Sequence, residues 1–112
     1  MTSTTSYTAG DLVLAVVPFS SGATAKLRPA LVVLDTTDND LVVARMTTQV
    51  HSTAWDVSVT EWKNAGLLGP GVIRLHKLTV LEKSLIHKRI GSLLPQDRQA
   101  VAIVLRQAFG NW

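Results

Sequence analysis

The chain lacks cysteine and carries few charges. The absence of cysteine among its 112 residues excludes disulfide cross-links, thiolate zinc sites and thiol nucleophiles. Charged residues make up only 17% of the chain and hydrophobic residues 46%, a balance that excludes a disordered protein. No apolar run approaches the roughly 18 residues that a membrane-spanning helix needs, so no membrane partner is expected. A single small domain remains, and its apolar excess favours a homo-oligomer.

An export signal is also missing from the N-terminus. The first eight residues, MTSTTSYT, include six Ser or Thr and have neither the basic start nor the apolar stretch of a signal peptide. We therefore expect a cytoplasmic protein with a flexible leader over residues 1–9 and a single domain over residues 10–112.

Basic residues are few in the first half of the chain, and acidic residues are few in the second half. Residues 1–56 carry three basic and five acidic groups, whereas residues 57–112 carry eight basic and three acidic groups. The net charge is +3. This asymmetry is compatible with a second half that faces nucleic acid, although basic surfaces are common.

Short apolar, β-branched runs bounded by turn residues predict an antiparallel sheet. The predicted strands cover residues 12–17, 30–34, 41–46, 56–59, 72–81 and 85–93. The alternation in the fifth run slips around His76 and Lys77, which indicates a bulge. The connection over residues 18–29, PFSSGATAKLRP, is long enough to be a flexible binding loop.

Two segments have helical character. Residues 60–66 predict one or two helical turns, with Thr60 as the N-cap and Gly66 as the stop. A C-terminal helix starts at Pro95 and ends at Gly110. Its apolar face consists of Val101, Val104, Leu105 and Ala108. The fold class is therefore mainly β (α+β), either a curled antiparallel sheet or a small barrel closed by a helix.

The histidines do not have the spacing of metal ligands. His51, His76 and His87 lie on different predicted elements, without an H-x-H or H-x-x-x-H pattern. We expect polar residues on sheet faces, although His76 and His87 could face each other across the last two strands. Glycine-rich phosphate loops and paired acids are missing too, so neither a metal nor a cofactor is predicted.

An arginine and two threonines are the strongest candidates for chemistry. Arg28 stands just before a strand whose start is fixed by Pro29, while Thr47 and Thr48 end another strand. A guanidinium fork with hydroxyl donors suits a phosphodiester, and no metal is needed where the RNA 2′-OH is the nucleophile. From these residues alone, a surface salt-bridge arginine and two β-favouring threonines are the favoured interpretation.

In order and spacing, four segments resemble the PemK/MazF family of toxins from type II toxin–antitoxin systems. The resemblance extends over about residues 10–109, and its segments are GDLVLAVVPF, KLRPALVVL, ARMTTQ and DVSVTEWKNAGLLGPGVIRLHKLTVLEKSLIHKRIGSLLPQDRQAV. It implies an SH3-like or CcdB-like small antiparallel barrel that forms a homodimer. It also implies a metal-independent endoribonuclease, an mRNA interferase, that cleaves single-stranded RNA to a 2′,3′-cyclic phosphate and a 5′-OH. A cognate antitoxin with a disordered acidic segment would silence it.

The resemblance also implies roles for individual residues. Arg28 would stabilise charge on the scissile phosphate, and Thr47 would position the phosphate or the attacking hydroxyl. Thr48 and Gln49, together with Lys26 from the preceding loop, would bind substrate. Two positions depart from other family members. The first loop has no acid at residues 23–25, which leaves the general base unassigned, and His76 stands where some members have an acid and could tune base preference.

Two other functions stay open at this stage. The first is a non-enzymatic poison of DNA gyrase, the mode of the related CcdB toxins, in which residues after the last helix matter; this chain ends in Trp112. The second is a degenerate member that binds RNA or antitoxin without cutting. Mixing the protein with RNA in the absence of gyrase separates all three.

Overall fold

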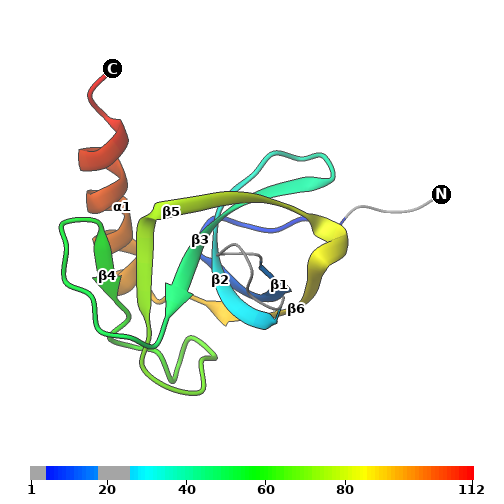
Figure 1. Cartoon of the computed structure of the whole chain (residues 1–112), viewed down its shortest axis with the longest axis horizontal. Coiled ribbons are helices and arrows are strands. Elements are labelled where there is room, and N and C mark those ends of the chain that lie inside the picture. Colours follow the sequence, from blue (N-terminus) through cyan, green and yellow to red (C-terminus); the bar gives the residue numbers. More distant parts are fainter. Residues whose placement is uncertain (1–4, 18–25) are drawn as a thin grey trace.

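The computed structural model describes residues 5–17 and 26–112 (Figure 1). Within them, the elements follow the order predicted from the apolar runs. They are β1 (Asp11–Val16), β2 (Leu27–Asp35), β3 (Asp40–Thr47), β4 (Asp56–Ser58), β5 (Val72–Glu82), the 3-10 turn η1 (Lys83–Leu85), β6 (Ile86–Ser92) and α1 (Pro95–Phe109). Every predicted strand is present, although β2 begins three residues earlier than expected.

The described strands form one antiparallel sheet in the order β4-β5-β3-β2-β1-β6. The sheet curls around itself, and α1 stands at the β4–β5 end (Figure 1). It does not close, because β4 and β6 are its two edges and each pairs with one neighbour among the described strands. The prediction of a mainly β domain with a C-terminal helix is confirmed, in the form of a curled open sheet.

A bulge in β5 produces much of this curl. Ala44 of β3 pairs with Leu78 while the next residue, Arg45, pairs with Arg74, so residues 75–77 have no partner on β3. Figure 1 shows β5 turning sharply along its length. The bulge predicted from the sequence is therefore confirmed. A bulge bends its strand, so the two ends of β5 can pair in differently oriented parts of the sheet.

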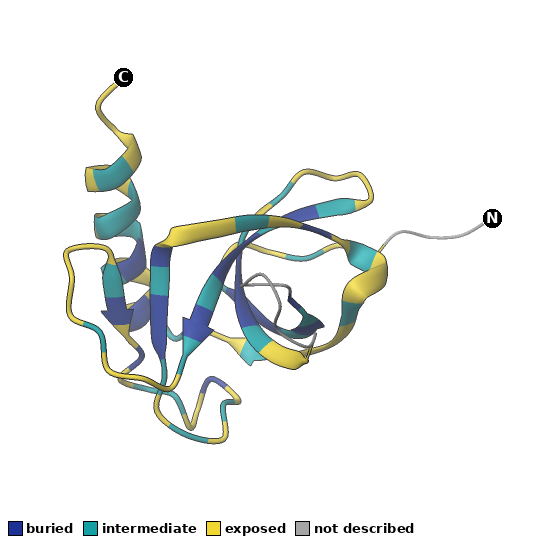
Figure 2. Cartoon of the chain, in the orientation of Figure 1, coloured by how far each residue is buried: buried dark blue, intermediate teal, exposed yellow. Residues whose placement is uncertain are grey.

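Figure 2 shows buried residues along the strands of the sheet and in the first part of α1. Most of them belong to two apolar clusters. Leu12 belongs to one cluster and its neighbour Val13 to the other, because successive strand residues point to opposite faces. The inner cluster, inside the curl, includes Val13, Ala15, Ala30, Val32, Leu41, Val43 and Leu81. The outer cluster, toward α1, includes Leu12, Leu31, Ala44, Met46, Ile73, Leu75, Leu93 and Val101.

Helix α1 begins at Pro95 as predicted, because a first helical residue needs no N–H partner. Val101 is buried against the outer cluster, while Val104 and Leu105 pack on it partly exposed. The later turns carry exposed Ile103 and Phe109. Among the described residues, no helix is both long and apolar enough to cross a membrane.

The helix predicted over residues 60–66 is wrong. The segment is a turn in which the Ala65 N–H donates to the Glu61 carbonyl, and Gly66 ends it with φ of +100°. Thr60 is not an N-cap: its hydroxyl and N–H both donate to Oδ1 of Asp97, at 2.8 and 3.1 Å. Asp97 also accepts the Glu61 N–H at 3.0 Å, so α1 holds the start of the turn.

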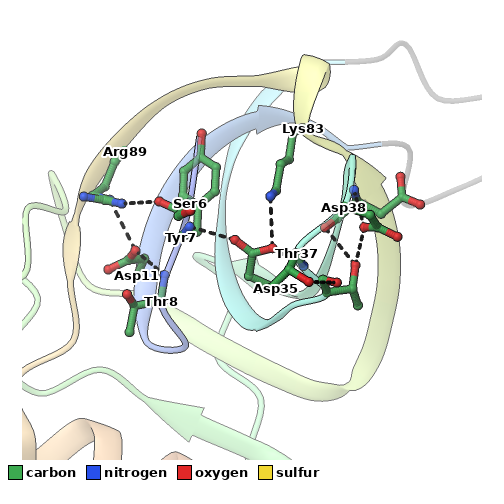
Figure 3. Close-up of polar contacts among 11 residues, drawn as sticks. Ser6, Tyr7, Thr8, Asp11, Asp35, Thr37, Asp38, Lys83 and Arg89 are labelled. Atoms are coloured by element: carbon green, nitrogen blue, oxygen red, sulfur yellow. Dashed lines mark hydrogen bonds and ion pairs between the residues drawn. The ribbon is translucent and has the colours of Figure 1, made fainter. Parts of the chain in front are cut away.

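The described end of the predicted leader is held against the sheet (Figure 3). The Tyr7 N–H donates to Asp35 at 2.8 Å, and Arg89 donates to the Ser6 carbonyl while stacking over the Tyr7 ring. Asp35 also pairs with Lys83 at 3.0 Å. The Tyr7 N–H, the Lys83 ammonium and a further backbone N–H lower the pKa of Asp35 to about 2.

Candidate functional site

A cavity of about 460 Å³ opens where the ends of β2 and β3 meet, and we call it the rim pocket. It combines apolar side chains with cationic and hydroxyl groups. Its lining consists of Leu14, Arg28, Pro29, Met46, Thr47, Thr48, Gly66, Leu67, Leu68, Gly69, Pro70, Gly71, Lys88 and Ile90. Among these residues there is no carboxylate and no histidine, so the charged groups at the pocket are all positive.

Strand register brings Arg28 and Thr47 to this pocket. The ladder between β2 and β3 starts at Ala30, opposite Arg45, and extending it by two residues places Arg28 across from Thr47. Arg28 is not in a loop as predicted: it is the second residue of β2 and pairs with Ala15. Pro29 lies ahead of the paired part on the β3 side, so its missing N–H costs no bond to β3.

A local hydrogen bond fixes the Thr47 hydroxyl. The backbone N–H of Gln49 donates to Thr47 Oγ1 at 3.1 Å, across the turn that ends β3. A hydroxyl has one proton and two lone pairs, so accepting this bond leaves the proton available for a ligand oxygen. Thr48 lines the pocket as well. Exposed Gln49 and Lys26 lie beside the rim in sequence but do not line it.

Lys88 of β6 is a pocket residue that the sequence analysis did not single out. It pairs with Leu14 of β1, and Leu14 pairs in turn with Pro29 of β2. Residues opposite one another in an antiparallel sheet project on the same face, so Lys88, Leu14 and Pro29 form one row. Arg28 and its partner Ala15 belong to the neighbouring row. The only feature of the sequence that pointed toward Lys88 was the excess of basic residues in the second half of the chain.

The two cations at the pocket differ from three others of the chain, which form ion pairs. Arg74 pairs with Asp56 at 2.9 Å, and Lys83 and Arg89 pair with Asp35 and Asp11. Within the described part of the chain, neither Arg28 nor Lys88 has an ion-pair partner. Two uncompensated cations beside hydroxyl donors form a binding site suited to an anion.

The outer wall of the pocket is the loop Leu67–Gly71, whose position is set by a close backbone contact. A Cβ on Gly91 would lie 1.9 Å from the Ala65 carbonyl oxygen, and a Cβ on Gly66 would lie 2.3 Å from that of Ile90. The turn and β6 can approach this closely because both positions are glycine. Leu68, at the tip of the wall, is fully exposed.

His76 is not at the rim pocket. It is exposed in the β5 bulge, and partial desolvation followed by the charge of Arg74 lowers its pKa. The possible pairing with His87 is wrong, because β5 and β6 are not neighbours in the sheet. Nearby Asp56 has its pKa lowered to about 2: burial raises it, but hydrogen bonds from Thr53 and Arg74 outweigh that effect.

Two further expectations bear on catalysis. Within the described ranges, no three His, Asp or Glu side chains are grouped so as to hold a metal ion. Residues 23–25, where the first loop lacks an acid, lie outside the described part of the chain.

A second cavity of about 400 Å³ lies between α1 and the sheet, and we call it the α1 groove. Apolar side chains of β2 and α1 form most of it, including Leu31, Val101 and Leu105. Arg98 and Arg106 of α1 also line it, and Arg98 donates to the Ala9 carbonyl at 2.7 Å.

Comparison with known proteins gives consistent matches. The family model of the PemK-like, MazF-like toxin of type II toxin–antitoxin systems matches residues 8–109. Comparison with curated proteins yields no match. An endoribonuclease in complex with its cognate antitoxin, from a mycobacterial species, has a TM-score of 0.75 and 20% identity over 96% of this chain and 98% of that chain.

Two further structures are similar at the same level. The Mycobacterium tuberculosis toxin MazF-mt6 has a TM-score of 0.74 and 24% identity over 91% of this chain and 99% of that chain. The MazE–MazF complex from Deinococcus radiodurans has a TM-score of 0.71 and 18% identity, with 93% and 96% of the two chains covered. At these identities the structural matches show a shared fold.

Proposed function

The chain belongs to the family of PemK-like, MazF-like toxins of type II toxin–antitoxin systems, and on that premise we propose that it is an endoribonuclease acting at the rim pocket. The observation that carries the proposal is the meeting of Arg28 and Thr47 in one cavity with uncompensated positive charge. The substrate would be single-stranded mRNA, cut at specific sequences.

In the proposed reaction the ribose 2′-OH attacks the adjacent phosphorus and the bond from phosphorus to the 5′-oxygen breaks. The products are a 2′,3′-cyclic phosphate and a 5′-OH. Arg28 would bind the phosphate oxygens, on which negative charge grows as the new bond forms. Thr47 would donate its free hydroxyl proton to one of these oxygens. The nucleophile is part of the substrate, so the attack requires no metal-bound water.

The direct test is incubation of the purified protein with a long single-stranded RNA in the presence of EDTA, followed by mapping of both new ends. Discrete cuts with cyclic phosphate and 5′-OH ends are expected. The Arg28→Ala protein, shown to be folded by circular dichroism, is the control and should not cut. Intact RNA with the native protein, or undiminished cutting by Arg28→Ala, would contradict the proposal.

We propose two protein partners. One is a cognate antitoxin, as in the mycobacterial and Deinococcus complexes with which the fold is shared. The other is a second copy of this chain. Leu34, Val42 and Val80 form one row across β2, β3 and β5, and Leu34 and Val80 are more than half exposed. A homodimer in light scattering, weakened by Val80→Lys, would support this surface.

The alternative function as a gyrase poison rests on one observation. Trp112 follows α1 and is fully exposed, as a residue used in contact with a partner would be. Inhibition of purified gyrase together with intact RNA would favour it. RNA binding without cleavage would instead identify a degenerate member of the family.

A further inference from the structure

The α1 groove carries positive charge that the fold leaves largely unused. Arg106 forms no ion pair with a described residue. Arg98 commits one of its five N–H groups, to the Ala9 carbonyl at 2.7 Å. Leu31 of β2 and Leu105 of α1 are among the apolar side chains that line the cavity, and no carboxylate is present among the described lining residues. The groove therefore suits a ligand that is both apolar and negatively charged.

One side of α1 continues this surface toward the C-terminus. Four residues of the helix follow one another at intervals of three or four positions: Arg98, Ala102, Leu105 and Phe109. Residues at such intervals lie along one side of a helix. Phe109 is 46% exposed, and Figure 2 shows the later turns of α1 extending beyond the sheet. Asp97, the acid of this helix, is buried, so the exposed charges of α1 are positive.

The two arginines have a spacing that fits an extended peptide segment. Arg106 follows Arg98 by two turns of helix, about 12 Å along the axis. In an extended chain, residues i, i+2 and i+4 point to the same side, and the first and last are about 13 Å apart. Acids at i and i+4 would therefore meet the two arginines, while an apolar side chain at i+2 would lie between them, over the apolar lining.

We propose that the α1 groove binds an extended segment of a partner protein in which acidic and apolar side chains alternate along one side. The groove takes no part in the RNA cleavage proposed above, so the two proposals stand or fall separately. A second copy of this chain is a poorer occupant. A two-fold contact through α1 would bring the arginines of one copy toward those of the other, and the described lining has no carboxylate to offset them.

The test uses two synthetic nine-residue peptides. The first has the order ESLSESLSE, and in the second lysine replaces every glutamate. Each is titrated into the isotope-labelled full chain and followed by NMR. We expect the glutamate peptide to shift the amide signals of Leu31, Ala102 and Leu105, which line the groove, and the lysine peptide to leave them in place.

Charge reversal at Arg106 tests the part played by the arginines. We expect Arg106→Glu to weaken binding of the glutamate peptide about tenfold or more, because a repulsive charge replaces a charge-assisted hydrogen bond. Lys77→Glu makes the same change of charge on an exposed lysine of β5 and is the matched control. Its affinity should stay within about twofold of the native value, because salt screens a charge outside the groove. The NMR spectrum of each variant also shows whether it is folded.

Absence of binding by the native protein would overturn the proposal, as would equal weakening by the two variants. Shifts centred on Arg28 and Thr47 would place the peptide in the rim pocket and overturn it too. Conversion of a dimer into a monomer by Arg106→Glu, measured by light scattering, would assign the groove to a second copy of this chain. Equally strong shifts with a uridine hexanucleotide would assign it to RNA. Either assignment would replace the one made here.

Discussion

The rim pocket and the α1 groove are alike in size and in having two cations, yet their chemistry differs. In the rim pocket, Arg28 and Lys88 lie with threonine hydroxyls and without a described ion-pair partner. In the α1 groove, Arg98 is already bound to the Ala9 carbonyl, and the walls are largely apolar side chains of the outer cluster. The hydroxyl groups beside the two cations make the rim pocket the better site for an anion.

The two regions are joined through one buried carboxylate. Asp97 lies in the first turn of α1, whose later residues line the groove, and it holds Thr60 and Glu61 at the start of the turn. That turn leads through Gly66 into the wall of the rim pocket. The following predictions separate the two pockets and test their connection, from the largest expected effect to the smallest.

Removing the guanidinium at the rim should have the largest effect. We expect Arg28→Ala to reduce RNA cleavage by about 10³-fold, because it removes the main stabilisation of phosphate charge in the transition state. Arg106→Ala, which removes a cation from the α1 groove, is the matched control and should leave cleavage unchanged. Single-turnover rates on a mapped RNA site provide the measurement. Equal losses in both variants would abolish the distinction between the pockets.

Removing the carboxylate that joins the two regions should destabilise the whole domain. Asp97→Ala leaves the partly buried N–H groups of Thr60 and Glu61 without their acceptor, and we expect a loss of about 3 kcal/mol in the free energy of unfolding. Urea denaturation measures it, with Gln107→Ala, an exposed residue of α1, as the control. A loss below 1 kcal/mol would mean that water replaces these bonds and that the turn is held by other contacts.

The Thr47 hydroxyl should matter less than Arg28. We expect Thr47→Ala to lower the cleavage rate about 30-fold, the value of one hydrogen bond to a charged group. Thr47→Ser keeps both the hydroxyl and the bond from the Gln49 N–H, so it should retain most of the activity. Rates for the two variants at saturating RNA provide the comparison. An equal defect in Ser and Ala would indicate that the methyl group is the important part of the side chain.

The smallest expected effect is on the pH dependence of stability, and it comes from Asp56, a carboxylate outside the rim pocket. The pKa of Asp56 is lowered to about 2 from an ordinary value of 3.8, so its ionised form stabilises the folded state. That contribution is complete above about pH 5 and disappears as the pH falls toward 2. After allowance for solvent screening we expect about 1 kcal/mol. Urea denaturation at pH 6 and pH 3 should show a smaller difference for Asp56→Asn than for the native protein.

The elements of the fold were accessible from the sequence because their signals are local. Apolar runs located the strands, the slip at His76 and Lys77 located the β5 bulge, and Pro95 located the start of α1. Local patterns failed at residues 60–66. There the sequence favours a helix, but a carboxylate 36 residues away binds the first N–H groups, and Gly66 must lie against β6.

The sequence by itself determined which segments are strands and helix, since side-chain periodicity and turn residues act over a few positions. It also offered Arg28 and Thr47 as candidates, through their residue types and the family resemblance. Only the tertiary structure decided that these two residues line one cavity, that Lys88 lines it with them, and that His76 lies elsewhere. Strand register causes the difference, because it pairs residues far apart in the chain, and a shift of one position would send each side chain to the opposite face.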